Sequence, residues 1–349
     1  MNKEYKIKKI YDIYLELTNI CNFNCKFCPY GQMKRKKGIM EKNFAFDIIE
    51  QIKEYDISKR IALFLMGEPF LVKYIFEVIE KIHQSGLQGI IHTNASLFND
   101  DLIEKILDSD LYELDISLQT FGSKAFYEKT DEKYDYKEYM KNILRFIKRH
   151  YEKKSKINVK IHFFASSIYQ YFIGAELKKF IKGDFKEVYL FFENWIRNNV
   201  IDDRMQIKDF ELSKYKEYDI LLLPNIHLVS RKVTTFGGNI GNKKKYKAVF
   251  GSCNALVNQI GILWNGIVVP CCNDYDGKIV LGDLHKDKLI DIINSEIAIK
   301  LYDGFKKGIV WHPVCKQCRG GSNIWYWLFK QSASFIGRYK NIGLKKDKF

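Results

Sequence analysis

Short apolar runs alternate with longer amphipathic segments through the first half of the chain. The runs have the length and composition of buried strands, and they cover residues 11–17, 60–65, 89–92, 111–117, 157–164 and 187–192. Between them, apolar residues recur at helical spacing, as in Phe44, Ile48, Ile49 and Ile52. This alternation predicts βα units around a parallel sheet. Six strands would form either an open doubly wound sheet or an incomplete α/β barrel.

The pattern changes near the C-terminus. Two apolar runs, 259–264 and 267–272, flank Asn265 and Gly266, which predicts a β-hairpin. A single helix is expected next, because one face carries apolar residues spaced by four and Gly308 follows to end it; those residues are Leu289, Ile293, Ile297, Leu301 and Phe305.

The segment between these two regions, residues 196–250, has a weaker pattern. It contains the apolar run 220–223, then Pro224 and a Gly-rich stretch, 236–241, which is typical of a linker. The expected organisation is a core domain, a linker, a small C-terminal domain and a basic tail, at residues 8–225, 226–247, 248–330 and 331–349.

Composition favours a globular protein of the cytosol. Of the 349 residues, 46% are hydrophobic, enough to bury a large core and to exclude wholesale disorder. The first residues show no continuous apolar stretch of the kind found in secretory signals, and no run is long enough to span a bilayer. We therefore expect a cytoplasmic protein with no membrane partner. Cytosolic thiols are kept reduced, so the eight cysteines are better explained as ligands than as disulfides.

The chain is strongly basic, with a net charge of +15 from 57 Lys and Arg against 42 Asp and Glu. Such a balance can indicate nucleic acid, an anionic lipid surface or a phosphorylated substrate. The lysines are spread over many segments, which favours an ordinary solvated surface over a nucleic-acid partner. Three local runs stand out, at 34–37, 243–245 and 338–348.

Three cysteines, Cys21, Cys25 and Cys28, directly follow the first predicted strand. Their spacing matches neither a zinc ribbon nor a four-cysteine ferredoxin run, and it leaves a fourth ligand to be supplied from elsewhere. With Phe27 before the last cysteine, the stretch resembles the radical S-adenosylmethionine (SAM) enzymes. In that family three cysteines hold a 4Fe-4S cluster, and the methionine part of SAM chelates the fourth iron.

Polar residues at the ends of the next strands support this resemblance. The stretch from Met66 through Gly67 and Glu68 to Pro69 is similar to the family's Gly-Gly-Glu-Pro, which holds the amino group of SAM; Met66 replaces the first glycine. By the same resemblance, further cofactor contacts fall on Thr93, Asn94, Ser117 and Gln119. Taken alone, Thr93 with Asn94, or Ser117 with Gln119, could be polar residues of an ordinary turn. All of them, however, follow successive strands, at the rim where α/β barrels place their active sites.

The remaining cysteines form a second set near the hairpin. On local grounds a structural zinc site would fit, because Cys315 and Cys318 have the spacing of half a zinc site. The order and spacing resemble the SPASM extension of radical SAM enzymes, or its shorter twitch form, which binds an auxiliary 4Fe-4S cluster. The resemblance implies one auxiliary cluster on Cys253, Cys271, Cys315 and Cys318, and therefore two 4Fe-4S clusters in the chain.

Cys272 is left without a partner by this assignment. Adjacent residues of a strand point to opposite faces, so Cys272 should face away from Cys271 unless the strand has already ended. It is either a small buried residue or a hydrogen-atom donor to a substrate radical.

The resemblance implies an α/β fold, an incomplete (β/α)6 TIM-like barrel followed by a small C-terminal domain. That domain consists of a β-hairpin and a helix and binds the second cluster. It also implies reductive cleavage of SAM, with electrons from a flavodoxin- or ferredoxin-type donor, to a 5'-deoxyadenosyl radical that abstracts a substrate hydrogen. We expect an oxidoreductase acting on a small sugar-like or cyclitol-like substrate, with the auxiliary cluster as electron acceptor, similar to the alcohol-oxidising dehydrogenase of aminocyclitol antibiotic biosynthesis. Peptide maturation or epimerisation is the alternative reaction, and a zinc protein that binds nucleic acid is the alternative class.

Overall fold

The computed structural model describes residues 5–130, 133–164, 185–200, 218–231, 246–321, 323–325, 327–332 and 334. Ten strands form one sheet in the order β10-β9-β8-β1-β2-β3-β4-β5-β7-β6. They are β1 (Asp12–Leu15), β2 (Arg60–Ala62), β3 (Gln88–Thr93), β4 (Glu113–Gln119), β5 (Asn158–Phe164), β6 (Asp219–Leu223), β7 (Ile226–Arg231), β8 (Gln259–Ile262), β9 (Ile267–Val269) and β10 (Gly282–Asp283).

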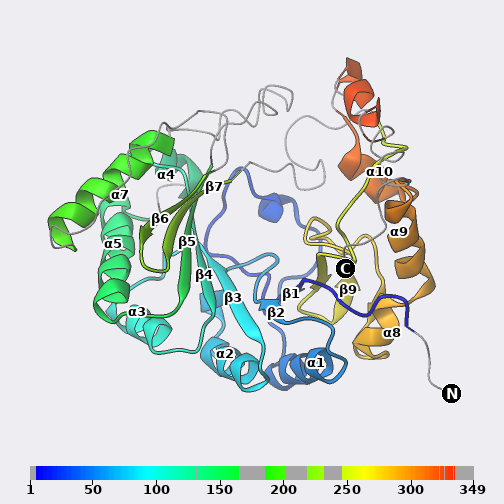
Figure 1. The fold of residues 1–349 in the computed structure, drawn as a ribbon, viewed down its shortest axis with the longest axis horizontal. Coiled ribbons are helices and arrows are strands. Elements are labelled where there is room, and N and C mark those ends of the chain that lie inside the picture. Colours follow the sequence, from blue (N-terminus) through cyan, green and yellow to red (C-terminus); the bar gives the residue numbers. More distant parts are fainter. Residues whose placement is uncertain are drawn as a thin grey trace.

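The central strands are parallel and curve into the predicted incomplete barrel. β1 to β5 pair in sequence order, β7 continues the parallel arrangement beside β5, and β8 lies parallel to β1 on the other side. Helices cover the outside of this curved sheet (Figure 1). In the core they are α1 (Lys42–Glu54), α2 (Ile75–Gln84), α3 (Asp100–Leu107), α4 (Ser123–Thr130), α5 (Tyr136–Glu152) and α7 (Phe185–Asn199).

The apolar stripe of α1 shows how the sequence pattern positions these helices. Ile48, Ile49 and Ile52 are fully buried against the sheet. The Glu41 side chain begins the helix by accepting a hydrogen bond from the Phe44 backbone N–H. With the helices held outside in this way, the ends of the parallel strands remain available to build a site.

One of the six predicted strands is wrong. Residues 187–192 lie inside α7 (Phe185–Asn199), where Val188, Tyr189 and Phe192 are buried at helical spacing. The segment resembles a strand because apolar residues also occupy its less buried side, where Leu190 is 40% exposed. The sixth parallel strand of the core is instead β7, which pairs with β5.

Residues 226–231, which the sequence placed in the linker, form β7 of the sheet, and the domain boundaries themselves stay a prediction. The apolar run 220–223 lies in β6, which pairs antiparallel with β7. Asn225, at φ +62°, makes the turn between them, a conformation that asparagine tolerates better than most residues. The Gly-rich stretch 236–241 and the lysines at 243–245 lie outside the described residues.

The predicted hairpin is confirmed as β8 and β9, with Gly266 at φ +83° in its turn. The predicted single helix is two helices, α8 (Leu289–Ile293) and α9 (Glu296–Lys306). Asn294 separates them: its side-chain oxygen accepts from the backbone N–H groups of Lys6 and Ile7 at 2.9 and 2.8 Å. This contact with the N-terminal segment favours a break that helical spacing alone did not predict.

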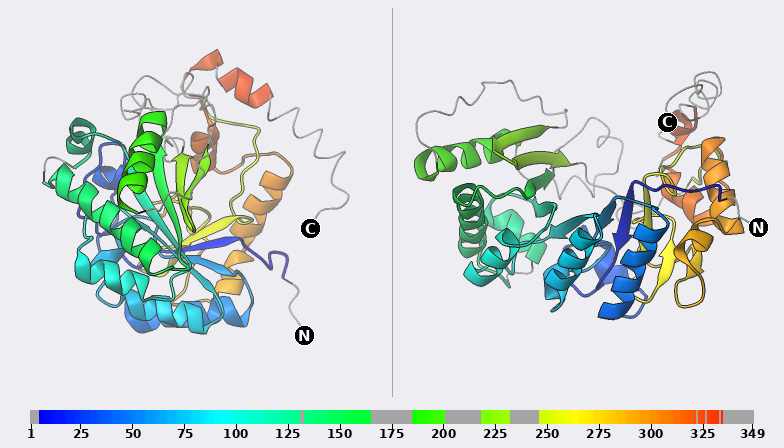
Figure 2. Two further views of the ribbon diagram at one scale, coloured as in Figure 1. Left: turned by 60° about the vertical axis from the view of Figure 1, so that its left-hand side comes forward. Right: turned by 60° about the horizontal axis from the view of Figure 1, so that its bottom comes forward.

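A further helix, α10 (Pro313–Arg319), follows α9, and Gly308 at φ +69° ends α9 as expected. The two further views show the N-terminal strands beside the hairpin and α8 to α10 at one end of the sheet (Figure 2). Among the described helices, none combines the length and the apolar character that crossing a bilayer requires.

Candidate functional site

The three-cysteine loop lies at the C-terminal end of β1 and opens onto a pocket that Cys21, Cys25 and Cys28 all line. A backbone hydrogen bond of 2.9 Å from Cys28 N–H to the Cys25 carbonyl holds the loop in a turn. Burial raises the pKa of Cys21 and of Cys28 to about 12. Both are therefore neutral thiols at pH 7 unless a metal centre supplies the positive charge that makes thiolates stable.

Glu68 is the most deeply buried acid of this pocket, with 1% of its surface exposed. Its carboxylate accepts hydrogen bonds from the Thr93 hydroxyl and the Asn94 N–H, both at 2.8 Å, and from the Phe70 N–H at 3.3 Å. Burial raises its pKa to about 7 despite these donors. Within the described residues, no Lys, Arg or His side chain forms an ion pair with it. The site therefore presents a carboxylate prepared for a cationic or amino ligand.

Backbone geometry explains the residues beside Glu68. Gly67 has φ +84°, and a Cβ there would lie 2.4 Å from the Thr18 carbonyl oxygen, so only glycine fits. The backbone N–H of Met66 donates to the Glu16 carboxylate at 3.2 Å. A side chain at this position does not interfere with that hydrogen bond. This explains why methionine can replace the first glycine of the expected stretch.

All the cofactor contacts expected on the first domain come together around this pocket. They are Gly67, Glu68, Thr93, Asn94, Ser117 and Gln119, from the ends of β2, β3 and β4. Asn94 also donates to the Asn22 side chain at 2.9 Å, which joins the end of β3 to the cysteine loop. Their convergence follows from the parallel sheet; that they bind SAM stays a prediction.

A polar network that was not predicted from the sequence is formed by His92, Asp115, His162 and Arg231, on neighbouring strands of the barrel. His92 and Asp115 face each other across β3 and β4, and His92 Nε2 contacts Asp115 Oδ2. His162 Nε2 lies 3.1 Å from the same oxygen, and Arg231 Nε donates to His162 Nδ1 at 2.8 Å. His92, His162 and Arg231 line the pocket, so this network forms part of its wall.

Electrostatics fix the charge of this network. Burial alone would raise the pKa of Asp115, but His92 and His162 outweigh it and hold that pKa well below its usual range. Burial lowers the pKa of His162 to about 4. Asp115 is thus ionised and His162 neutral at pH 7.

Two histidines and a carboxylate also suit a divalent metal, and ligand atoms of His92, Asp115 and His162 lie within 4.8 Å of one another. The contact with Arg231 argues against this. Because Nδ1 of His162 accepts from Arg231, its proton belongs on Nε2, the atom that would have to ligate. We interpret the group as a hydrogen-bonded network. In the sequence, the only signal was isolated polar residues within buried strands.

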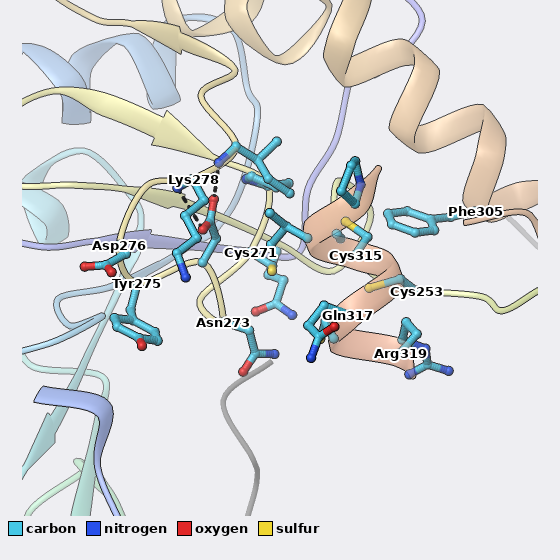
Figure 3. A pocket seen from close by; sticks show the side chains of 18 of the residues that line it. Cys253, Cys271, Asn273, Tyr275, Asp276, Lys278, Phe305, Cys315, Gln317 and Arg319 are labelled. Atoms are coloured by element: carbon cyan, nitrogen blue, oxygen red, sulfur yellow. Dashed lines mark hydrogen bonds between the residues drawn. The ribbon is translucent and has the colours of Figure 1, made fainter. Parts of the chain in front are cut away.

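Four cysteines line a second pocket between the hairpin and α10: Cys253, Cys271, Cys315 and Cys318. In Figure 3 the side chains of Cys253, Cys271 and Cys315 point towards a shared space beside α10. Burial raises the pKa of Cys315 to about 12 and that of Cys271 well above its usual range. The eight cysteines, all of them described residues, form no disulfide. The second set thus has the composition of a complete four-thiolate metal or cluster site.

Cys272 lines the first pocket, away from the second, although β9 has already ended at Val269. Strand alternation is therefore not what separates Cys272 from Cys271, because that prediction applied only if the strand continued through both residues. Burial raises the pKa of its thiol to about 11. Asn273 lines both pockets, so residues 271–273 form a wall between them.

Arg35, from the basic run 34–37, is not a solvated surface residue. Both Nη atoms bind the Glu16 carboxylate, with Nη1 at 2.6 Å from Oε2, and Nε donates to the Tyr275 carbonyl at 2.5 Å. Glu16 also accepts from the Trp264 N–H at 3.2 Å. Arg35 thereby ties the first cysteine loop to the hairpin that leads into the second site.

Two family models match the chain. The model of the radical SAM superfamily covers residues 15–162, and that of the SPASM iron-sulfur cluster-binding domain covers residues 253–319.

Similarity to individual proteins is more distant. The chain is 25% identical over 341 residues to a GTP 3',8-cyclase of Vibrio atlanticus, covering 85% of the chain and 92% of the relative. It is 33% identical over 96 residues to an S-adenosylmethionine-dependent nucleotide dehydratase of Flammeovirga pacifica, covering 26% of the chain and 32% of the relative. In this match and in those to two other curated relatives, the chain spans only between 30% and 37% of the relative's length.

Solved structures share the fold. BtrN in complex with AdoMet and 2-DOIA matches with a TM-score of 0.50 at 17% identity, over 88% of this chain and 89% of that one. Streptococcus suis SuiB bound to the precursor peptide SuiA matches with a TM-score of 0.53 at 15% identity, over 90% and 72%.

Proposed function

Since the chain belongs to the radical SAM superfamily and carries a SPASM domain, we propose that it is an enzyme that cleaves SAM reductively to activate a C–H bond. Cys21, Cys25 and Cys28 would hold the 4Fe-4S cluster that binds SAM. The cysteines of the second pocket would hold one auxiliary 4Fe-4S cluster, giving two clusters in the chain.

The observation that carries this proposal is Glu68. A fully buried carboxylate that receives three hydrogen bonds, and forms no ion pair among the described residues, is costly to ionise. The amino group of SAM would supply the missing partner. The three-thiol set in the same pocket fits a cluster with one iron left for that cofactor.

When bound, the clusters and SAM supply a hydrogen-abstracting 5'-deoxyadenosyl radical and an electron acceptor. The chain's own residues then position the substrate. Phe64 and Phe164 form apolar walls, and His92 stacks on Phe64 with ring centroids 3.7 Å apart. With Asp115 oriented against it, His92 is the residue best placed to accept a hydroxyl proton.

This polar wall favours oxidation of an alcohol carbon in a small sugar-like or cyclitol-like substrate. A flavodoxin- or ferredoxin-type protein would provide the reducing electron. Peptide modification is the second candidate, favoured by Cys272, which faces the same pocket and could return a hydrogen atom to a substrate radical. Among proteins of similar fold, one binds 2-DOIA and another a precursor peptide, so the fold accommodates both kinds of ligand.

Anaerobic reconstitution with iron and sulfide tests the proposal. We expect about eight irons per chain, two four-iron clusters, and release of 5'-deoxyadenosine on reduction. Zinc with no cleavage of SAM would overturn it. Substrates labelled with deuterium at carbon then separate the two candidates: a ketone product supports alcohol oxidation, whereas solvent hydrogen incorporated into a peptide, and lost in Cys272→Ala, supports epimerisation.

A further inference from the structure

A groove between α5 and α7 lies on the outside of the barrel and shares no lining residue with either cysteine pocket. Both helices bury apolar residues against the sheet, as Phe146 and Phe192 do. The seam between the helices is lined by Leu144 of α5 and by Phe191 and Trp195 of α7, which are only partly buried. In Figures 1 and 2 the two helices lie side by side, at the end of the sheet opposite α8 to α10. The groove therefore has an apolar floor that is open to solvent.

One rim of this groove is basic. Four cations line it, all from α5: Lys137, Lys141, Arg145 and Lys148. Spacings of four, four and three residues place them along one side of the helix, over about 16 Å of its axis. No Asp or Glu is among the described residues that line the groove. The groove thus presents a line of positive charge beside its apolar floor.

The ion pairs of these cations leave their charge available to a ligand. Lys137 forms no ion pair within the described part of the chain. The other three cations pair at 3.4 to 3.9 Å with acids that do not line the groove, namely Glu138, Asp100 and Glu152. Each of these acids is more than half exposed, and surface ion pairs of this kind contribute little. An anionic ligand can therefore replace them.

The shape of this charge indicates the kind of partner. A single phosphate group requires cations that converge on one point, whereas these four are spread along a helix. They match an amphipathic helix that carries acidic residues along one flank and apolar residues towards the floor. A single-stranded nucleic acid fits less well, because its bases stack on free aromatic faces. Phe191 instead packs against Phe121 and Phe192, with ring centroids 5.0 and 5.4 Å apart.

We propose that the groove between α5 and α7 binds an acidic amphipathic helix of a partner protein. Apolar side chains of that helix lie on Leu144, Phe191 and Trp195, and its carboxylates pair with the cations of α5. This interaction does not depend on the proposed reaction, because the groove is separate from both cysteine pockets. The basic runs of the sequence did not indicate it, since the cations of α5 are spaced along a helix. Two of those runs, 243–245 and 338–348, lie outside the described residues.

Fluorescence anisotropy of a labelled probe peptide tests this proposal on the full, reconstituted chain. The probe is a helix of about five turns, with leucine at helical spacing on one face and glutamate along one flank of that face. We expect saturable binding that weakens as salt rises from about 0.05 to 0.5 M. Replacing Lys137, Lys141 and Lys148 by Gln should weaken it at least about fivefold. Leu144→Gln should weaken it by about tenfold, through the loss of apolar contact.

The matched control replaces Lys300, Lys306 and Lys307 by Gln, which removes the same charge from exposed positions in and directly after α9. It should leave peptide binding unchanged, and all variants should keep their iron content. Equal weakening in this control would overturn the proposal, because attraction to the net charge of +15 would then explain the binding.

Two further ligands complete the test on the wild-type chain, so the outcome does not depend on the folding of any variant. A peptide of the same composition, with its leucines and glutamates shuffled so that no apolar face remains, should bind at least about tenfold more weakly. Equal binding of the shuffled peptide would overturn the proposal. So would single-stranded oligouridine that binds more tightly than the probe and displaces it, because the groove would then be a nucleic-acid site.

Discussion

Replacing Glu68 by glutamine removes a buried negative charge while keeping the size of the side chain. The glutamine oxygen can still accept from the Asn94 N–H, and the Thr93 hydroxyl can rotate to accept from the new amide. The variant loses the 3.3 Å bond from the Phe70 N–H, which shares Oε1 with Thr93, and it loses the carboxylate that we propose faces the amino group of SAM. A hydrogen bond to a charged group contributes about 1.5–3 kcal/mol, so we expect Glu68→Gln to bind SAM roughly ten- to a hundredfold more weakly.

The ratio of SAM affinities between wild type and Glu68→Gln should also change with pH, in a direction that the pKa of Glu68 determines. The pKa of Glu68 is about 7 before the cofactor binds. About one-tenth of the carboxyl groups are therefore ionised at pH 6 and about half at pH 7. Because SAM requires the ionised form, wild-type affinity should rise about fivefold over this interval beyond any rise in Glu68→Gln. The cofactor's own titration is common to both proteins and cancels in their ratio.

Equilibrium binding of SAM to anaerobically reconstituted protein at pH 6 and pH 7 measures both effects. Glu113→Gln serves as the matched control, because Glu113 is also a buried acid but begins β4, at the end of that strand away from the pocket, and pairs with Lys160 at 2.7 Å. Its SAM affinity should equal that of the wild type at pH 7. Equal affinities of wild type and Glu68→Gln, or a ratio between them that does not change with pH, would refute the reasoning.

Three further variants address other parts of the structure. Cys315→Ala with Cys318→Ala should lose about half of the iron, measured by colorimetric assay, and full retention would show that the auxiliary cluster is held elsewhere. Arg35→Met leaves the carboxylate of Glu16 buried and unpaired and should lower the free energy of unfolding by about 3–5 kcal/mol in urea titrations; adding Glu16→Gln should recover part of the loss. His92→Gln should still form 5'-deoxyadenosine with substrate but yield less oxidised product by mass spectrometry, and an unchanged yield would remove His92 from the proton transfer.

The parts of the site that could be predicted from sequence share one property: their residues lie close together in the chain or follow a strand directly. The spacing of Cys21, Cys25 and Cys28 is local, and parallel strands bring their carboxyl ends to one rim whatever the helices between them do. For the same reason Glu68 and Asn94 could be placed beside the cysteines before the fold was known.

What could not be predicted depends on contacts between distant segments. The network of His92, Asp115, His162 and Arg231 needs the register of four strands, and no single strand shows it. The break at Asn294 comes from hydrogen bonds to the N-terminal segment, where the bonded residue Ile7 lies 287 positions away in the sequence. Residues 187–192 were misassigned because apolar side chains occupy both sides of α7, which hides the helical period within a window of six residues.

The wall formed by residues 271–273 constrains how this enzyme can diversify. One side of these residues borders the four-cysteine pocket and the other borders the three-cysteine pocket. Under the proposed function, a substitution at Cys272 or Asn273 that reshapes the first pocket would therefore also disturb Cys271, a proposed cluster ligand. New substrate preferences could arise more freely at His162, Phe164 and Arg231, which line the same pocket from β5 and β7, two strands that contain no cysteine. Relatives with the same two sets of cysteines should differ in substrate mainly through the residues at those positions.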